Sequence, residues 1–456
     1  MSNPTPDSAS APAGTNTLKH GAVGWVLLAS LGVSYVIAGD YSAWNFGLQH
    51  GGWGGLAVAV LFGAAMYYAL LGTLAELAAI IPEAGGGSAF AAHAFGAWAG
   101  CLTGACIWVE YVAAAAVIAV FLQAYLQALT GIGGAPVVIG AFALFILIHA
   151  AGVGEALRVL LVMALVALVG LIAFVVAMAP HFEAHRLVDL PVGRAVGASR
   201  WLPMGLMGIW SALPFGTAFF LGVEGIAMAA EETRDPHRNV PRGMLAALLV
   251  LTLFAALLVT LGPGAAGVRT LQQAEDPLVV GLNAIARAGS AHWVVTLVNI
   301  CGLAGLMACL FSAIFGYSRL TYALARAGDL PGGLARTNRR LVPVTAIVVP
   351  GLIACALALT GAAEAIFVLM VCAGTLSYLL MVPAHWMMRR RAPRLERPYR
   401  TPGGVWTSGF AWLCSAVMLA ACFIANPGWS SVTIVVLALF LCSYALRLRL
   451  RRVSLA

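Results

Sequence analysis

The chain is built from long apolar segments separated by short polar ones. Apolar runs near 20 residues or longer recur about twelve times, and one such helix crosses the roughly 30 Å of bilayer hydrocarbon. The pattern therefore predicts an all-α integral membrane protein with about twelve transmembrane helices. We place them at 22–48, 54–81, 97–129, 136–151, 153–179, 204–230, 242–262, 291–323, 343–360, 363–388, 404–424 and 430–448.

Composition agrees with this pattern and excludes a soluble globular protein. Hydrophobic residues make up 62% of the 456 residues and charged residues only 9%, and the mean hydropathy is +0.95. Residues 1–20 are rich in Ser, Pro, Ala and Thr. We expect them to form a disordered cytoplasmic tail.

Basic residues are distributed unevenly between the two sides of the predicted spans. Of the 25 Lys and Arg residues, 20 fall on the side of the N-terminus and 5 on the other side. This bias predicts that both termini are cytoplasmic in a multi-pass protein of the inner (plasma) membrane. The net charge of +8 then reflects topology, and we expect no nucleic-acid partner.

The nine cysteines include no CxxC pair. Most lie in apolar spans, where cysteine behaves as a small buried hydrophobe rather than as a ligand. We therefore predict neither a metal nor a cofactor.

Three carboxylates lie within apolar spans. They are Asp40, Glu110 and Glu224. An ionisable group at membrane depth costs several kcal/mol unless it lines a wet cavity or meets a partner. The three acids therefore predict a cavity that receives a cation.

Glycines accompany two of these acids and predict breaks in their helices. Span 1 contains Ala38-Gly39-Asp40, and span 6 contains Pro214, Gly216 and the stretch 221–225. These spans begin two halves of five spans each. Glycine-interrupted segments at matching positions indicate the central site of a transporter. The alternative is close packing of helices through small residues.

Four motifs make the chain similar to amino acid–polyamine–organocation superfamily permeases. They are residues 76–90 after helix 2, 231–242 after helix 6, 317–331 at the end of helix 8 and 397–404 before helix 11. The resemblance implies a leucine-transporter-like fold with an inverted five-helix repeat, discontinuous helices 1 and 6, and two trailing helices.

The domain organisation follows from that resemblance. A transport core is expected at 21–388, with repeats at about 21–180 and 203–388. Residues 389–456 would hold a cytoplasmic loop, helices 11 and 12 and a basic tail. Within the superfamily, residues 39–48 and 110–112 resemble the ethanolamine permease branch.

The residues at the expected break in helix 1 favour an amine without a carboxylate. In relatives that carry amino acids, a Gly-x-Gly break exposes N–H groups that suit a carboxylate. Here Asp40 and Tyr41 replace the second glycine. A negative charge would repel a carboxylate and attract an ammonium group. We expect the substrate site to contain Ala38, Gly39, Asp40, Tyr41, Glu110, Phe219, Phe220, Gly222 and Glu224.

Three glutamates are candidates for coupling or gating. Glu110 has three interpretations: contact with the substrate, carriage of a coupling proton, or a structural bond to a broken helix. Glu224 has three as well: gate, proton carrier or partner of the backbone. Glu76 either joins arginines at an inner gate or stabilises the helix bundle.

The sequence therefore predicts a secondary active transporter that imports ethanolamine, or a similar small cationic amine, by alternating access with a coupled proton. An amino acid or polyamine permease of the same superfamily is the alternative. An amine-sensing receptor and a membrane-embedded enzyme are remote ones. No catalytic motif supports an enzyme, and without a P-loop we do not expect direct drive by ATP.

Overall fold

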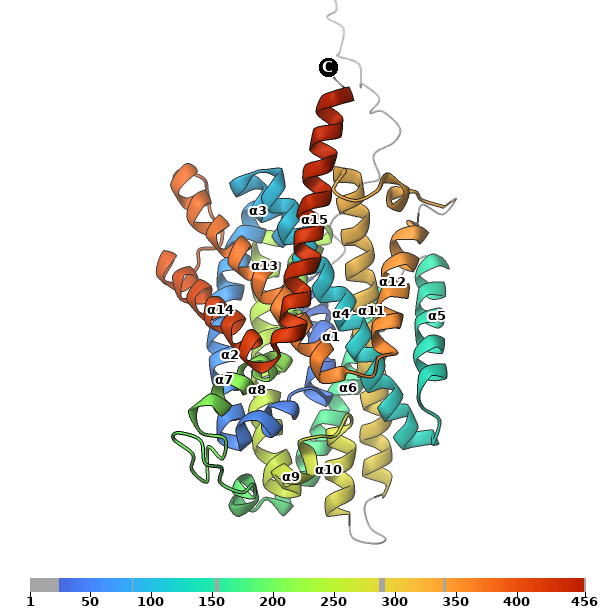
Figure 1. Cartoon of the computed structure of the whole chain (residues 1–456), viewed down its shortest axis with the longest axis vertical. Coiled ribbons are helices and arrows are strands. Elements are labelled where there is room, and N and C mark those ends of the chain that lie inside the picture. The colour runs from blue at the N-terminus through green and yellow to red at the C-terminus, as the bar shows by residue number, and fades with distance from the viewer. Residues whose placement is uncertain (1–23, 84, 152–155, 287–291, 339–341, 455–456) are drawn as a thin grey trace, which may run out of the picture.

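The computed structural model describes residues 24–83, 85–151, 156–286, 292–338 and 342–454. Within these ranges the chain is helical and contains no β-strand. Long helices run side by side along the molecule, and α15 rises above the others near the C-terminus (Figure 1). The prediction of an all-α fold is confirmed. The predicted tail at 1–20 lies outside the described residues.

The described helices account for all twelve predicted spans. Eight of them are long and apolar enough to cross a membrane, a ninth span is a bent pair, and three shorter apolar helices complete the set. The spans are α1 (Trp25–Tyr41), α2 (Phe46–Ile80), α4 (Ala97–Thr130), α5 (Ala135–Ala151), α6 (Ala156–Met178), the pair α7 (Gly205–Gly216) and η4 (Val223–Glu232), α8 (Pro236–Ala266), α11 (His292–Ala327), α12 (Val344–Ala358), α13 (Ala363–Arg391), α14 (Val405–Ala425) and α15 (Pro427–Ser454).

Local sequence explains where several helices begin and end. Pro236 occupies the first position of α8, where its missing N–H costs nothing because that group has no helical acceptor. Gly131 ends α4 in a left-handed conformation, with φ 75°, and its N–H donates to the Gln127 carbonyl over 2.8 Å. This conformation is accessible to glycine at little cost.

Span 6 is interrupted, as predicted. After α7, the short 3₁₀ turn η3 (Thr217–Phe219) leads to Gly222, which has φ 102°. The helical segments on either side meet at 43°. A φ in this range is strained for residues with a side chain, so Gly222 makes the break possible.

Span 1 is also interrupted, but not at Ala38-Gly39-Asp40 as predicted. The helix α1 continues through these residues to Tyr41, and the break lies at 42–45, where Ala43 has φ 78°. The first residues of α2, 46–51, then complete the span, because Gly52 bends the chain with φ 66° and ψ −172°. Gly39 serves a close helix contact instead, as described below.

Several short helices between the spans were not predicted by hydropathy. They include α3 (Gly87–Phe95), η2 (Ala184–Val188), α9 (Val268–Leu271), α10 (Pro277–Ile285) and η5 (Gly332–Ala335). Each is shorter than a membrane span, so a search for apolar runs of about 20 residues cannot find it.

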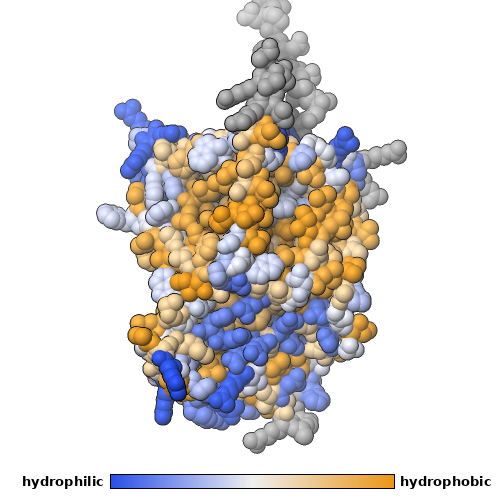
Figure 2. Space-filling view, in the orientation of Figure 1, coloured by the Kyte–Doolittle hydropathy of each residue, from blue (hydrophilic) through white to orange (hydrophobic). Residues whose placement is uncertain are grey.

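The two ends of the bundle differ in chemistry. We call the end where α2 finishes and α8 starts the basic end; it carries Arg238, Arg242 and Arg389–Arg391. The opposite end carries α9 and α10 (Figure 1). Apolar residues cover much of the face drawn in Figure 2, and hydrophilic residues gather toward its lower end. An apolar surface of this kind suits a bilayer.

Candidate functional site

A small cavity lies at the centre of the bundle. Five spans line it, with residues from α1, α4, the break between η3 and η4, α11 and α13. Its volume is about 40 Å³, and a single water needs about 10–15 Å³. The cavity therefore suits a compact solute.

The two interrupted spans meet at one wall of this cavity. Gly39 of α1 packs against the backbone of Ala218 in η3, so closely that a Cβ on Gly39 would lie 1.8 Å from the Ala218 carbonyl oxygen. Both residues line the cavity. Only glycine fits here, because any side chain would force the two backbones apart.

The break in span 1 leaves backbone donors beside the cavity. Ala43 lines the cavity, and no acceptor in the described chain receives the N–H groups of Ala43, Trp44 or Asn45. These groups precede the helical turns at 46–51. The start of a helix has unpaired N–H groups and a partial positive charge, which together favour an anion.

A pair of carboxyl groups forms the polar end of the cavity. Glu110, on α4, is 3% exposed, and the carboxyl group of Glu224 on η4 lies close to it. Two buried carboxyl groups this close repel each other when both are ionised, so the arrangement favours one proton on the pair.

Two tyrosines continue the polar contacts from Glu224 away from the cavity. The Tyr378 hydroxyl donates to Glu224 Oε1 over 2.7 Å, and the Tyr67 and Tyr378 hydroxyls are 2.9 Å apart. The other oxygen of Glu224 accepts the N–H of Gly222 over 3.1 Å. Glu224 thus satisfies a backbone group freed by the break in span 6, which matches one of its three predicted roles.

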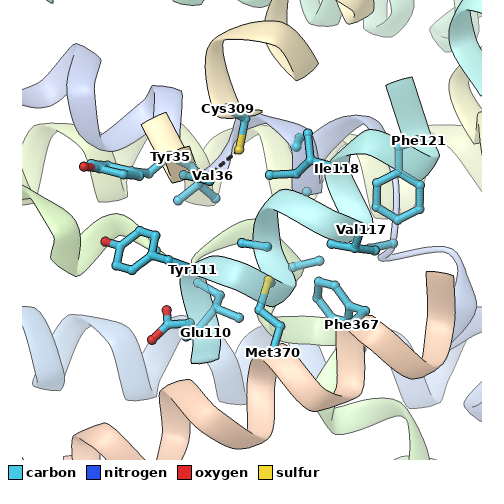
Figure 3. A pocket seen from close by; sticks show the side chains of 18 residues that line it. Tyr35, Val36, Glu110, Tyr111, Val117, Ile118, Phe121, Cys309, Phe367 and Met370 are labelled. Carbon is cyan, nitrogen blue, oxygen red and sulfur yellow. Dashed lines mark hydrogen bonds between the residues drawn. The ribbon is translucent and has the colours of Figure 1, made fainter. Parts of the chain in front are cut away.

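The opposite end of the cavity is apolar. Figure 3 shows Glu110, Tyr111 and Tyr35 toward one side and Phe121 and Phe367 toward the other. The Cys309 thiol donates to the Tyr35 carbonyl over 2.9 Å. The lining residues include no basic side chain, so Glu110 supplies the only formal charge among them.

The structure brings four of the nine predicted site residues together around the cavity: Ala38, Gly39, Glu110 and Gly222. Glu224 lies directly behind Glu110, as described above. Three others pack elsewhere in the interior. The Tyr41 hydroxyl donates to the Ala167 carbonyl over 2.7 Å, the Phe219 ring stacks on Trp44, and the Phe220 ring faces Tyr67.

Asp40 lies on α1 next to the cavity but is not among its lining residues. Its side chain is 0% exposed, and neither carboxyl oxygen has a hydrogen-bond partner in the described chain. Its backbone carbonyl accepts the indole N–H of Trp44 over 3.2 Å. A buried carboxyl group without partners is rare and calls for an explanation.

Glu76 is held in a buried network at the basic end. Arg389 contacts both of its carboxyl oxygens, at 3.0 and 2.7 Å, and the Thr401 N–H donates to Oε2 over 2.7 Å. Nε2 of His385 lies 3.2 Å from Oε2, and Nε of Arg397 lies 3.2 Å from Oε1. The network ties α2 to α13 and to the loop before α14, and none of its members lines the cavity.

Several cavity residues carry no signal in the sequence. Phe367 and Met370 belong to an apolar stretch of α13. Tyr378 is one of eleven tyrosines in the chain. Among the residues that the structure describes, no group of three or more His, Cys, Asp or Glu side chains is arranged to hold a metal ion.

Comparison with known proteins places the chain among membrane transporters. Residues 26–453 match the family model for amino acid permeases. The chain is 25% identical over 401 residues to a branched-chain amino acid permease of Bacillus subtilis, covering 82% of this chain and 80% of that protein. It is 26% identical over 388 residues to a probable GABA permease of Pseudomonas aeruginosa, covering 79% and 77%.

A solved structure shares the fold. The manganese transporter of Eremococcus coleocola superposes with a TM-score of 0.59 at 14% identity, covering 94% of this chain and 97% of that one. At this identity the likeness concerns the fold alone.

Proposed function

Because the chain belongs to the amino acid permease family, we propose that it is a secondary active transporter that carries a small amino acid by alternating access. The observation that carries this proposal is the position of Glu110. Its carboxyl group forms the charged end of an enclosed, otherwise mostly apolar cavity between two interrupted spans. Such a cavity is where transporters of this architecture bind their substrates.

The geometry accommodates both charged groups of an amino acid. The substrate ammonium group would bind Glu110, because hydrogen bonds to an ionised acceptor are the stronger kind. The substrate carboxylate would meet the free N–H groups at residues 43–45. An apolar side chain would lie toward Ile118, Phe121 and Phe367.

The structure weakens the argument for ethanolamine. That argument held that Asp40 would repel a substrate carboxylate, yet Asp40 is not among the residues that line the cavity. The relatives named above are also amino acid permeases. Ethanolamine stays the second candidate, since no basic side chain lines the cavity to pair with a carboxylate.

We also propose that transport is coupled to protons through the pair formed by Glu110 and Glu224. In this proposal the pair shares one proton. A positively charged ammonium group that binds beside the pair favours release of that proton. Tyr378 and Tyr67 continue the hydrogen-bonded chain from this pair. The excess of basic residues supports an orientation with the basic end and both termini in the cytoplasm. Repeats at about 21–180 and 203–388 stay a prediction.

Uptake by the purified protein in proteoliposomes tests the proposal. We expect uptake of a small neutral radiolabelled amino acid, inhibition of that uptake by a proton ionophore, and little competition from ethanolamine. Glu110→Gln should lower uptake at least tenfold, because loss of a buried charged partner costs about 2–5 kcal/mol. The exposed Glu396→Gln variant is the control.

Two outcomes would overturn this assignment. Uptake of ethanolamine that amino acids fail to inhibit would restore the amine as substrate. Full uptake by Glu110→Gln would remove Glu110 from the site.

A further inference from the structure

A second and larger hollow lies on the outside of the bundle at the basic end. It runs between α2 and α8 and is closed on one side by residues 398–407. Its volume is about 650 Å³, against about 40 Å³ for the central cavity. We call it the α2–α8 groove. His237 links the two helices at the end of the groove near Ala79, because its Nδ1–H donates to the Ala79 carbonyl over 2.7 Å.

Positive charge lines the rim of the groove. Arg238 and Arg242 both line it. The described chain provides Arg242 with no ion pair, and Nε of Arg238 reaches Asp235 only at 4.0 Å, with the Arg238 side chain 76% exposed. An exposed pair at this distance contributes little, so both guanidinium groups are available to an anion.

The deeper wall of the groove is apolar. Leu245 and Leu248 follow Arg242 along α8, and Ala65 faces them from α2. At 1.5 Å per residue, Leu248 lies roughly 15 Å deeper than Arg238 along the helix. Ala65 and Leu245 are exposed, so the groove opens to the surroundings of the bundle. The charged rim and the apolar surface below it match the polar headgroup layer and the hydrocarbon layer of one bilayer leaflet.

We propose that the α2–α8 groove binds an anionic phospholipid of the cytoplasmic leaflet. The lipid phosphate would contact Arg238 and Arg242, and an acyl chain would lie against Ala65, Leu245 and Leu248. The proposal rests on the proposed orientation, with the basic end in the cytoplasm. The N-terminal residues 1–23 are a poorer occupant, because Asp7 is their only acid.

Lipid binding to the purified full-length protein tests this proposal without any transport assay. Native mass spectrometry would count bound palmitoyl-oleoyl-phosphatidylglycerol and palmitoyl-oleoyl-phosphatidylcholine in parallel titrations. We expect one phosphatidylglycerol to bind at least tenfold more tightly than phosphatidylcholine. Arg238→Gln with Arg242→Gln should remove that preference. The matched control is Arg336→Gln with Arg394→Gln, which removes the same charge from exposed arginines outside the groove.

A second variant tests the apolar wall. Ala65→Trp places a bulky ring in the groove at an exposed helix position, so it should weaken lipid binding while the melting temperature stays unchanged.

Three results would overturn the proposal. They are equal affinity for the two lipids, equal weakening by the control double variant, and displacement of the lipid by inorganic phosphate alone. Because no substrate is involved, these results are independent of whether the protein carries an amino acid.

Discussion

The Tyr378 hydroxyl on α13 donates a hydrogen bond of 2.7 Å to Oε1 of Glu224 on η4. The bond joins the span that supplies Phe367 and Met370 to the interrupted span 6. It also fixes the carboxyl group that lies close to Glu110. Movement of span 6 during transport would therefore shift the carboxyl groups at the charged end of the cavity.

Replacing Tyr378 with Phe removes this bond without changing the ring. A hydrogen bond to a charged group contributes about 1.5–3 kcal/mol, so we expect Tyr378→Phe to lower amino acid uptake at least tenfold. Tyr67→Phe is the matched control, because it breaks only the next link in the chain. If both variants lower uptake equally, the bond to Glu224 has no special role.

Asp40→Asn should lower uptake while the protein still reaches the membrane, because a buried carboxyl group without a hydrogen-bond partner in the described chain is expected at membrane depth only where it serves function. The amide has nearly the same shape as the carboxyl group, so the packing of α1 is retained and the ionisable group is lost. Leaving the buried amide without a partner costs about 1–3 kcal/mol, which the bundle should tolerate. Uptake normalised to the amount of protein in the membrane is the measurement.

Asp235→Asn is a suitable comparison for Asp40→Asn, because this partly exposed residue lies in a loop and both residue types accept its left-handed conformation. Normal transport by Asp40→Asn would show that the acid in span 1 is not needed.

Gly39→Ala should disrupt the contact between the two interrupted spans. The new methyl group would lie 1.8 Å from the Ala218 carbonyl oxygen, and a backbone atom cannot rotate away as a side chain can. We expect loss of uptake of at least tenfold and a lower melting temperature. Gly140→Ala in α5 meets nothing within 4 Å, so it should leave both unchanged or raise the melting temperature slightly.

Glu76→Gln should destabilise the basic end of the bundle. Removing the charge leaves Arg389 and Arg397 without their buried anion, and breaking a buried ion pair costs about 3–5 kcal/mol. The thermal melting of the purified protein measures this loss. The exposed Glu396→Gln variant should melt like the wild type, and an unchanged melting temperature for Glu76→Gln would show that the network is dispensable.

The contribution of the loop between α9 and α10 to protein stability should depend on pH. Burial raises the pKa of Asp276 from its ordinary 3.8 to about 6, and the nearby Glu275 charge also raises it. The folded loop thus favours the protonated acid. Its contribution to stability is full below about pH 4 and is lost as the pH rises to about 6.

Asp276→Asn should remove this dependence, because asparagine stays neutral and still suits the start of a helix. Relative to the wild type, the variant should therefore melt higher at pH 7 than at pH 4. A constant difference between the two proteins across this range would contradict the raised pKa.

The spans were predictable because each is a long apolar run bounded by polar residues, and the break in span 6 was predictable because Gly222 supplies a left-handed turn. The break in span 1 was misplaced because Gly39 serves a tertiary contact that local sequence does not show. Glu110 of α4 and Glu224 of span 6 were both predicted as site residues, but their proximity could not be, because the fold brings together two segments over a hundred residues apart. Phe367 and Met370 could not be found, since an apolar residue at a cavity looks like one facing lipid.

Gly39 and Ala218 touch through main-chain atoms, with no rotatable group between them to take up a displacement. We therefore expect a tilt of α1 to displace the middle of the sixth span as well, because neither backbone can yield at this contact.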